Sequence, residues 1–194
     1  MDTTIRTLER SDTAEQLIRA KLRAGHFQKW QIDALDKLGH PVFGDGVRKF
    51  NWENWDSRKE FLASLPDFLV KQFAISCAEH VLPIWIKEFP DDQRPAQAIQ
   101  AAKDYLDGKI TLEELQEKED AARAARAAWA AAWSARAAGY AAGYAAMAAA
   151  DMAAEASWYA GNAAWYAANA AWYAAEYEWQ TQELTRMILT HVAH

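Results

Sequence analysis

Apolar and polar positions along this chain recur mostly at helical intervals. Residues 27–39 and 66–88 carry apolar side chains three and four positions apart, which is the spacing of one helix face. No run shows the two-residue alternation of a β-strand, and Asn-Gly or Asp-Gly turns are few. The pattern predicts an all-α fold: a multi-helix bundle in a single domain, with a long Ala-rich helical hairpin or bundle in the C-terminal part.

Two helices and an aromatic loop are predicted near the N-terminus. Ser11 and Asp12 can cap a first helix that Gly25 ends. A second helix covers residues 27–39, and its apolar positions are Trp30, Ile32, Leu35 and Leu38. Residues 40–55 combine one proline and two glycines with four aromatic side chains, which favours an ordered loop anchored on the core over a ligand pocket.

A short helix and a long apolar helix come next. Asp56 is the predicted cap of the short helix, and Pro66 fits the first turn of the long one. Pro83 is expected to kink or end the long helix, because proline has no amide hydrogen to donate. The predicted core residues of this helix are Phe68, Leu69, Phe73, Ile75, Ala78, Val81 and Leu82.

Two more helices begin with clear local signals. One starts near Pro95 and stops at Gly108. The next is capped by Thr111, which forms a capping box with Glu114: each side chain accepts a hydrogen bond from the other residue's free amide.

The Ala-rich part of the chain carries a regular stripe. Between residues 123 and 183 the large or charged side chains stand three or four positions apart, which places them on one side of packed helices. The alanine side allows two helix axes to approach closely. Because a single rod of this length is improbable in a chain of short helices, breaks are expected near Gly139 or Asp151 and near Gly161.

The bulky side of this stripe supports two interpretations. Buried tryptophans would form the core that alanine cannot provide, whereas an exposed ladder of Trp, Asn and Glu would suit a protein interface. The core interpretation is favoured overall, although asparagines inside a dry core need hydrogen-bond partners. The candidate partner-binding residues are Trp158, Asn162, Trp165, Asn169, Trp172, Glu176 and Trp179.

Charge and composition exclude several functions. Residues 1–110 carry 16 basic and 17 acidic side chains and residues 111–194 carry 5 and 10, so the net charge of −6 divides into −1 and −5. Neither half has the basic excess of a nucleic-acid-binding protein. The uncharged residues 156–175 are long enough to span a bilayer but are mostly alanine with two asparagines, so we expect no membrane partner.

Candidate chemistry is sparse. His191 and His194 have a ligand-like spacing, but at the end of the chain this is more often a frayed terminus than a metal site. Cys77, the single cysteine, lies in an apolar helix as a core thiol. Glu79 and His80 are adjacent in sequence and so point about 100° apart on a helix. We expect no enzyme, no metal and no cofactor. A single cysteine and a polar start without an export signal favour a cytoplasmic location.

Residues 73–110, followed by the Ala-rich tail, resemble a family of bacterial immunity proteins, the fifth-immunity-like group associated with polymorphic toxin systems. The matching features are CAEHVLP at 77–83, FPDDQRPAQAIQAAKDYLDGKI at 89–110, and a tail that repeats Ala-Ala-aromatic. The resemblance extends from about residue 73 to about residue 190.

The resemblance implies an all-helical cytoplasmic protein that binds and neutralises a toxin. Similar proteins also occur in phage and mobile-element settings, where the target would be a host defence factor. The family motif itself, Glu79, Asp91, Asp92 and Arg94, is read as a structural corner: the aspartates cap the helix near Pro95, and Arg94 pairs with Glu79 or Asp91.

Three hypotheses follow for function. The first is an inhibitory binding protein whose partner is a toxin or a defence factor. The second is a small-ligand protein with a pocket lined by Trp52, Trp55 and aromatics of the tail. The third is a structural homodimer in which the stripe packs on a second copy.

Overall fold

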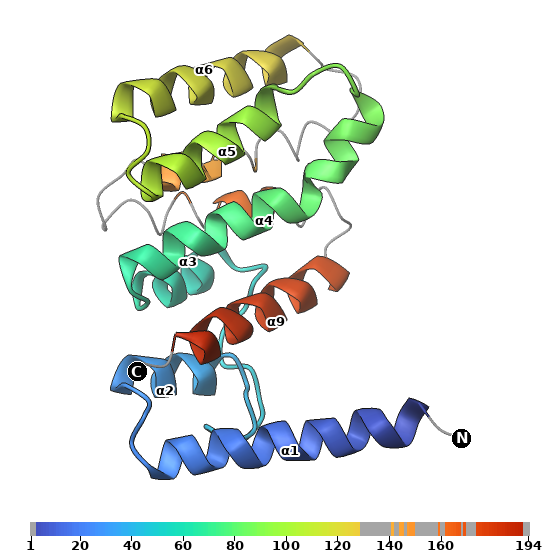
Figure 1. The fold of residues 1–194 in the computed structure, drawn as a ribbon, viewed down its shortest axis with the longest axis vertical. Coiled ribbons are helices and arrows are strands. Elements are labelled where there is room, and N and C mark those ends of the chain that lie inside the picture. The colour runs from blue at the N-terminus through green and yellow to red at the C-terminus, as the bar shows by residue number, and fades with distance from the viewer. Residues whose placement is uncertain are drawn as a thin grey trace. The chain divides into compact units, whose positions relative to one another are not determined.

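The computed structural model describes residues 3–128, 141, 144–145, 147–149, 159, 162–167, 169 and 174–191. Every regular element in these ranges is a helix, so the predicted all-α fold is confirmed. The helices are α1 (Thr3–Arg23), α2 (Lys29–Lys37), α3 (Trp55–Ala63), α4 (Asp67–Glu88), α5 (Arg94–Leu106), α6 (Leu112–Ala128) and α9 (Ala174–Thr190), as labelled in Figure 1. Among the described residues, no helix combines the length and the apolar character that crossing a membrane requires.

Backbone contacts divide the chain into two compact units. One unit contains Met1–Phe50 with Thr185–His194, and the other contains Asn51–Leu184. Helix α9 therefore contributes its first turns to the second unit and its last turns to the first. The candidate residues of the sequence stripe and of the family motif all belong to the second unit.

In the first unit, α1 begins earlier than predicted. The helix starts at Thr3 and passes through Ser11 and Asp12, so the predicted cap at these two residues is wrong. No proline or glycine interrupts residues 3–23, and a capping side chain does not by itself stop a helix that is already formed. Gly25 adopts a positive φ of 74° and ends the helical segment as expected.

A buried glutamine on α2 bonds the end of α9 within the first unit. Gln31 is fully buried, and its Nε2 donates to the carbonyl oxygens of Ile188 at 3.1 Å and His191 at 3.2 Å. Carbonyls in the last turn of a helix lack intrahelical partners, and Gln31 supplies a donor for them. Of the predicted apolar positions of this helix, the buried ones are Leu35 and Leu38, and the partly exposed ones are Trp30 and Ile32.

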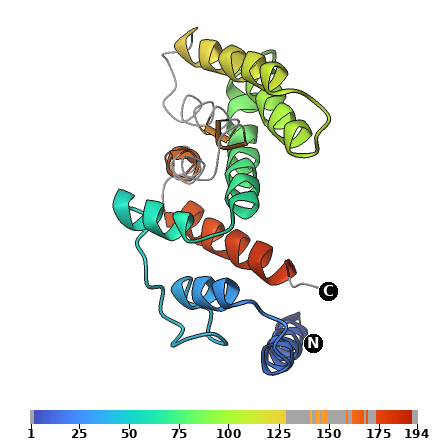
Figure 2. The same cartoon turned by 90° about the vertical axis from the view of Figure 1, so that its left-hand side faces the viewer.

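The second unit is a helical array. Helix α5 packs against both α4 and α6, and the two views of Figures 1 and 2 show these three helices as neighbours. The cap of α3 is Asn54 and not Asp56, because the Asn54 side chain accepts a hydrogen bond from the Ser57 amide at 2.8 Å. Asp56 lies in the first turn instead, where its charge meets the positive end of the helix dipole.

Helix α4 continues through its proline. It runs to Glu88 with Pro83 inside it, so the proline does not end the helix. Figure 1 shows the axis of α4 changing direction toward its C-terminal end. Of the predicted core residues, the buried ones are Leu69, Phe73, Ile75, Ala78 and Val81. Phe68 is 38% exposed and Leu82 is partly exposed. At about 100° per residue, Phe68 falls on the side of α4 opposite the core.

The aromatic loop is anchored on the second unit through Trp52. This side chain is 1% exposed, its Nε1 donates to Thr181 Oγ1 at 2.8 Å, and its ring stacks on Tyr177 with an interplanar angle of 3°. The predicted anchoring of the loop by its aromatics is confirmed at this residue.

Local signals located the remaining helix ends correctly. Helix α5 begins at Arg94, and Gly108 follows its end with a φ of 69°. The capping box of α6 is present: the Thr111 amide donates to Glu114 Oε2 at 2.8 Å, and the Glu114 amide donates to Thr111 Oγ1 at 3.3 Å. The predicted breaks near Gly139, Asp151 and Gly161 lie outside the described residues.

Small side chains of the Ala-rich part are packed inside the second unit. The buried alanines among the described residues are Ala141, Ala145, Ala148, Ala149, Ala163, Ala164 and Ala167. Tyr144 stacks on Tyr166 at a ring distance of 5.4 Å, which brings two segments of this part together. The burial of these alanines agrees with the prediction that the alanine side of the stripe allows close helix contact.

Candidate functional site

The sequence stripe is divided between interior and surface. Asn169 and Glu176 are buried, whereas Asn162, Trp165 and Trp179 are partly exposed. Trp158 and Trp172 lie outside the described residues. The Nδ2 atom of Asn169 donates to the carbonyl oxygen of Trp165 at 2.7 Å, which provides the partner that a buried asparagine requires.

Glu176 is the most unusual member of the stripe. Its side chain is 1% exposed, and its Oε1 accepts a hydrogen bond from Gln180 Nε2 at 3.2 Å. The Oε2 atom lies 3.1 Å from His80 Nε2, an ion-pair distance, without the geometry of a hydrogen bond. Burial raises the pKa of Glu176 to about 7, and the Gln180 hydrogen bond opposes this rise.

His80 joins this buried carboxyl to the surface. Its ring stacks on Trp179 at 3.8 Å with an interplanar angle of 12°, and 38% of its side chain is exposed. Burial lowers the pKa of His80, while the negative charge of Glu183 acts in the opposite direction. Helices α4 and α9 thus meet at this polar contact inside the second unit, and also through the hydrogen bond that Ser76 Oγ donates to Glu183 Oε1 at 3.2 Å.

Cys77 lies one turn before His80 on α4. It is fully buried, so the predicted core thiol is confirmed. Burial raises the pKa of this thiol, and the negative charges of Glu176 and Glu183 raise it further. A thiol in these surroundings stays protonated and is a poor nucleophile.

The contact between His80 and Glu176 was not predicted. The two residues lie on different helices far apart in the sequence, and no spacing rule connects them. The available signal was a glutamate within a stripe of bulky aromatics, because a carboxylate in such surroundings needs a polar partner.

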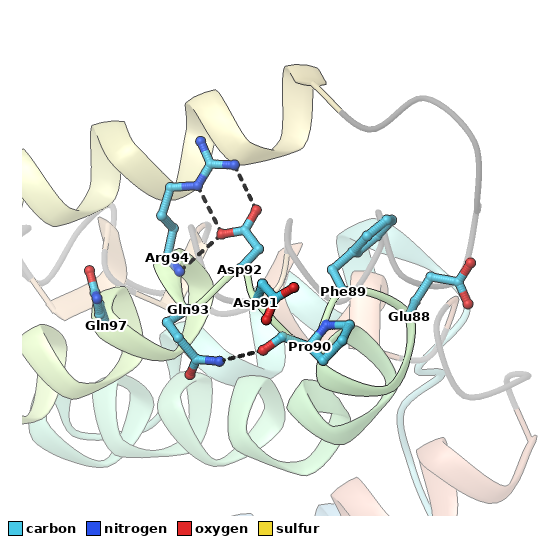
Figure 3. A pocket seen from close by; sticks show the side chains of 8 residues that line it. All are labelled: Glu88, Phe89, Pro90, Asp91, Asp92, Gln93, Arg94 and Gln97. Atoms are coloured by element: carbon cyan, nitrogen blue, oxygen red, sulfur yellow. Dashed lines mark hydrogen bonds and ion pairs between the residues drawn. The ribbon is translucent and has the colours of Figure 1, made fainter.

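A pocket of about 770 Å³ lies where α4 ends and α5 begins (Figure 3). Its lining residues are Glu88, Phe89, Pro90, Asp91, Asp92, Gln93, Arg94 and Gln97. Arg94 donates to Asp92 through Nε to Oδ1 at 2.9 Å and through Nη2 to Oδ2 at 2.6 Å. The predicted pairing of Arg94 with Glu79 or Asp91 is therefore wrong. Asp92, two residues away, offers both oxygens to the guanidinium fork, and Glu79 pairs with Lys103 at 2.8 Å.

The turn behind the pocket is anchored by Trp85. This fully buried side chain donates from Nε1 to the Asp92 carbonyl oxygen at 2.8 Å and packs against Phe89 with a ring distance of 4.8 Å. The backbone amide of Arg94 donates to Asp92 Oδ1 at 3.2 Å, so Asp92 accepts from a free amide at the start of α5 as predicted, although the N-cap position is Gln93. Asp91 accepts no such bond from a described residue, so its predicted capping role is wrong. The structural-corner interpretation of the family motif agrees with these contacts.

The pocket carries an excess of negative charge. Asp92 is neutralised by Arg94, but the exposed carboxylates of Glu88 and Asp91 make no ion pair or hydrogen bond to any described residue. Glu88 is the last residue of α4, where the partial negative charge of the helix end has the same sign as its carboxylate. This corner therefore presents a surface that attracts cationic groups.

These features define an all-α protein with a carboxylate-rich corner and a buried polar contact. Among the described residues, no group of three or more His, Cys, Asp and Glu side chains could hold a metal ion. His194 lies outside the described residues, and the His191 carbonyl accepts a hydrogen bond from Gln31.

The chain belongs to the family described as Imm-5 like putative immunity protein, whose sequence model matches residues 62–187. The resemblance recognised in the sequence is thereby confirmed, and the match begins further toward the N-terminus than residue 73. The family indicates an immunity-type role and, with it, a protein partner such as a toxin. Comparison with curated proteins and with solved structures gave no match.

Proposed function

We propose that this protein neutralises a toxin in the cytoplasm by binding it directly. The observation that carries the proposal is membership of an immunity-protein family over residues 62–187. These residues contain the pocket corner and the contact between α4 and α9, so the proposal assigns the binding surface to the second unit.

The pocket corner is the proposed first contact. Glu88 and Asp91 are exposed carboxylates without intramolecular partners among the described residues. Complementary charge accelerates the encounter of two proteins and selects the correct partner. A toxin with a basic surface would therefore associate faster with this corner than a neutral one.

Partly exposed tryptophans supply a second element of the proposed surface. Trp165 and Trp179 each keep part of the indole accessible, and tryptophan is enriched among the residues that dominate binding free energy. Trp179 is held in one orientation by its stack on His80, which reduces the entropy lost on binding.

Co-expression tests this proposal. A toxin encoded next to this gene should arrest growth alone, and co-expression of this protein should restore growth and give a complex of the two proteins. If the toxin is neither bound nor neutralised, and pull-downs capture a host defence factor instead, the proposed toxin partner is wrong. The partner is then the host defence factor.

Neutralising the carboxylates of Glu88 and Asp91 tests whether the pocket corner binds the toxin. The variant with Glu88→Gln and Asp91→Asn is expected to weaken toxin binding about tenfold, mainly through a slower association rate that becomes less sensitive to salt. Glu60→Gln, at an exposed position of α3, is the matched control and should bind as the wild type does. Equal association rates for both variants, measured by stopped flow, would remove the corner from the interface.

A further inference from the structure

We propose that Glu176 and His80 form a proton-controlled contact between α4 and α9 that sets the position of Trp179. The proposal concerns the free protein and does not depend on the identity of a toxin. It rests on the burial of the carboxyl, on its position facing the imidazole, and on the stack of the imidazole with an indole.

A buried carboxyl needs hydrogen-bond donors for its oxygens. Glu176 receives one hydrogen bond from Gln180, whose Nε2 also donates to the Ala164 carbonyl oxygen at 2.8 Å. The second carboxyl oxygen has no hydrogen-bond partner and lies 3.1 Å from His80 Nε2. An ionised carboxylate with a single amide hydrogen bond is poorly compensated in the interior, whereas a neutral carboxylic acid carries no charge to compensate.

Few other titratable groups lie near Glu176 and His80 among the described residues. From α4 the neighbouring titratable group is Cys77, which stays neutral, and from α9 it is Glu183, which bears the same charge as an ionised Glu176. The segment 162–167 contributes the Ala164 carbonyl through Gln180. No described cation other than a protonated His80 compensates a charge on Glu176.

The protonation of Glu176 makes the stability of the folded protein depend on pH. The folded-state pKa of Glu176, about 7, lies above its ordinary value of 4.5. The native protein therefore binds this proton more tightly than the unfolded chain does. The stabilisation is complete below pH 4.5 and is lost as the pH rises through about 7. His80 has a lowered pKa, so its protonation in acid opposes folding below its ordinary value of 6.5. The contact is strongest in slightly acidic solution, where the pair shares one proton.

Loss of the Glu176 proton changes the surroundings of Trp179. When Glu176 ionises, a negative charge appears on a buried side chain whose Oε2 has no hydrogen-bond donor. The carboxylate is then drawn toward water, and the turn of α9 that carries both Glu176 and Trp179 follows it. Because Trp179 packs on His80 at 3.8 Å, its indole changes surroundings at the same pH.

Nuclear magnetic resonance of the full chain tests this inference. The carboxyl carbon of Glu176 and the indole Nε1–H of Trp179, assigned with Trp179→Phe, are followed from pH 5 to pH 9. Both signals are expected to shift with one common midpoint near 7. In Glu176→Gln the step near pH 7 should be absent from the Trp179 signal, because the amide cannot ionise. A shift confined to lower pH reports the protonation of His80, whose ring stacks on the indole.

Glu178→Gln is the matched control, since Glu178 is an exposed glutamate two residues along the same helix. It should retain the transition of the wild type. A Trp179 signal that stays constant in the wild type, or that titrates equally in Glu176→Gln, overturns the proposal. If Glu176→Gln fails to fold, the wild type alone decides: different midpoints for Glu176 and Trp179 also overturn it.

Discussion

Replacing Trp85 by alanine is expected to lower the free energy of unfolding by about 3–5 kcal/mol, since a fully buried aromatic leaves a large cavity. The side chain fills the second unit beside Phe89 and donates to the Asp92 carbonyl. Its removal therefore empties part of the core and releases the turn that shapes the pocket. Urea unfolding followed by circular dichroism measures the loss.

Two further variants separate packing from hydrogen bonding at this position. Trp85→Phe keeps much of the ring but leaves the Asp92 carbonyl without its donor, so a loss of about 1–3 kcal/mol is expected. Ile86→Ala changes the neighbouring side chain, which is 39% exposed, and should cost well under half as much as Trp85→Ala. Equal losses for Trp85→Ala and Ile86→Ala would contradict the role assigned to Trp85.

Replacing Arg58 by alanine is the second change expected to lower the free energy of unfolding strongly. The side chain is 2% exposed, its Nη1 donates to the Trp52 carbonyl, and its guanidinium lies 5.1 Å from the ring centre of Trp55. No described carboxylate pairs with it, its Nε has no acceptor, and burial lowers its pKa. Arg58→Ala should cost about 2–4 kcal/mol, because it leaves a cavity and a buried carbonyl without a donor.

Arg58→Met separates the volume of this side chain from its charge. Methionine fills much of the same space, and replacing a buried charge by an apolar group of similar size is often close to neutral. A loss below about 1.5 kcal/mol is expected in urea unfolding. Lys59→Met, at the exposed next position of α3, should change little. If Arg58→Met costs as much as Arg58→Ala, the guanidinium hydrogen bond outweighs packing.

Local chemistry in the sequence predicted most of the helix ends. Gly25 and Gly108 end helical segments, and Thr111 with Glu114 caps α6 as expected. One error, at Ser11 and Asp12, arose because a residue type that suits a cap also occurs inside a helix; another arose where two local signals competed. Asn54 and Asp56 both suit a cap, and only the position of the Ser57 amide decides between them.

The candidate site was harder to predict because its contacts join distant segments. The stripe showed that Glu176 and Trp179 lie on one side of a helix, but no spacing could show that His80 faces both. Pairing within the family motif was mistaken for a related reason. Arg94 had several carboxylates within reach, and the turn anchored by Trp85 places Asp92 in front of it.

The composition of the first unit has a consequence for synthesis on the ribosome. Gln31 is synthesised 157 residues before Ile188 and 160 residues before His191, whose carbonyl oxygens are its two acceptors. Helix α2 therefore acquires these native bonds only after α9 has been made. Until then its buried amide stays hydrated, and a nascent chain stalled before residue 188 would hold α2 without the helix end that it binds.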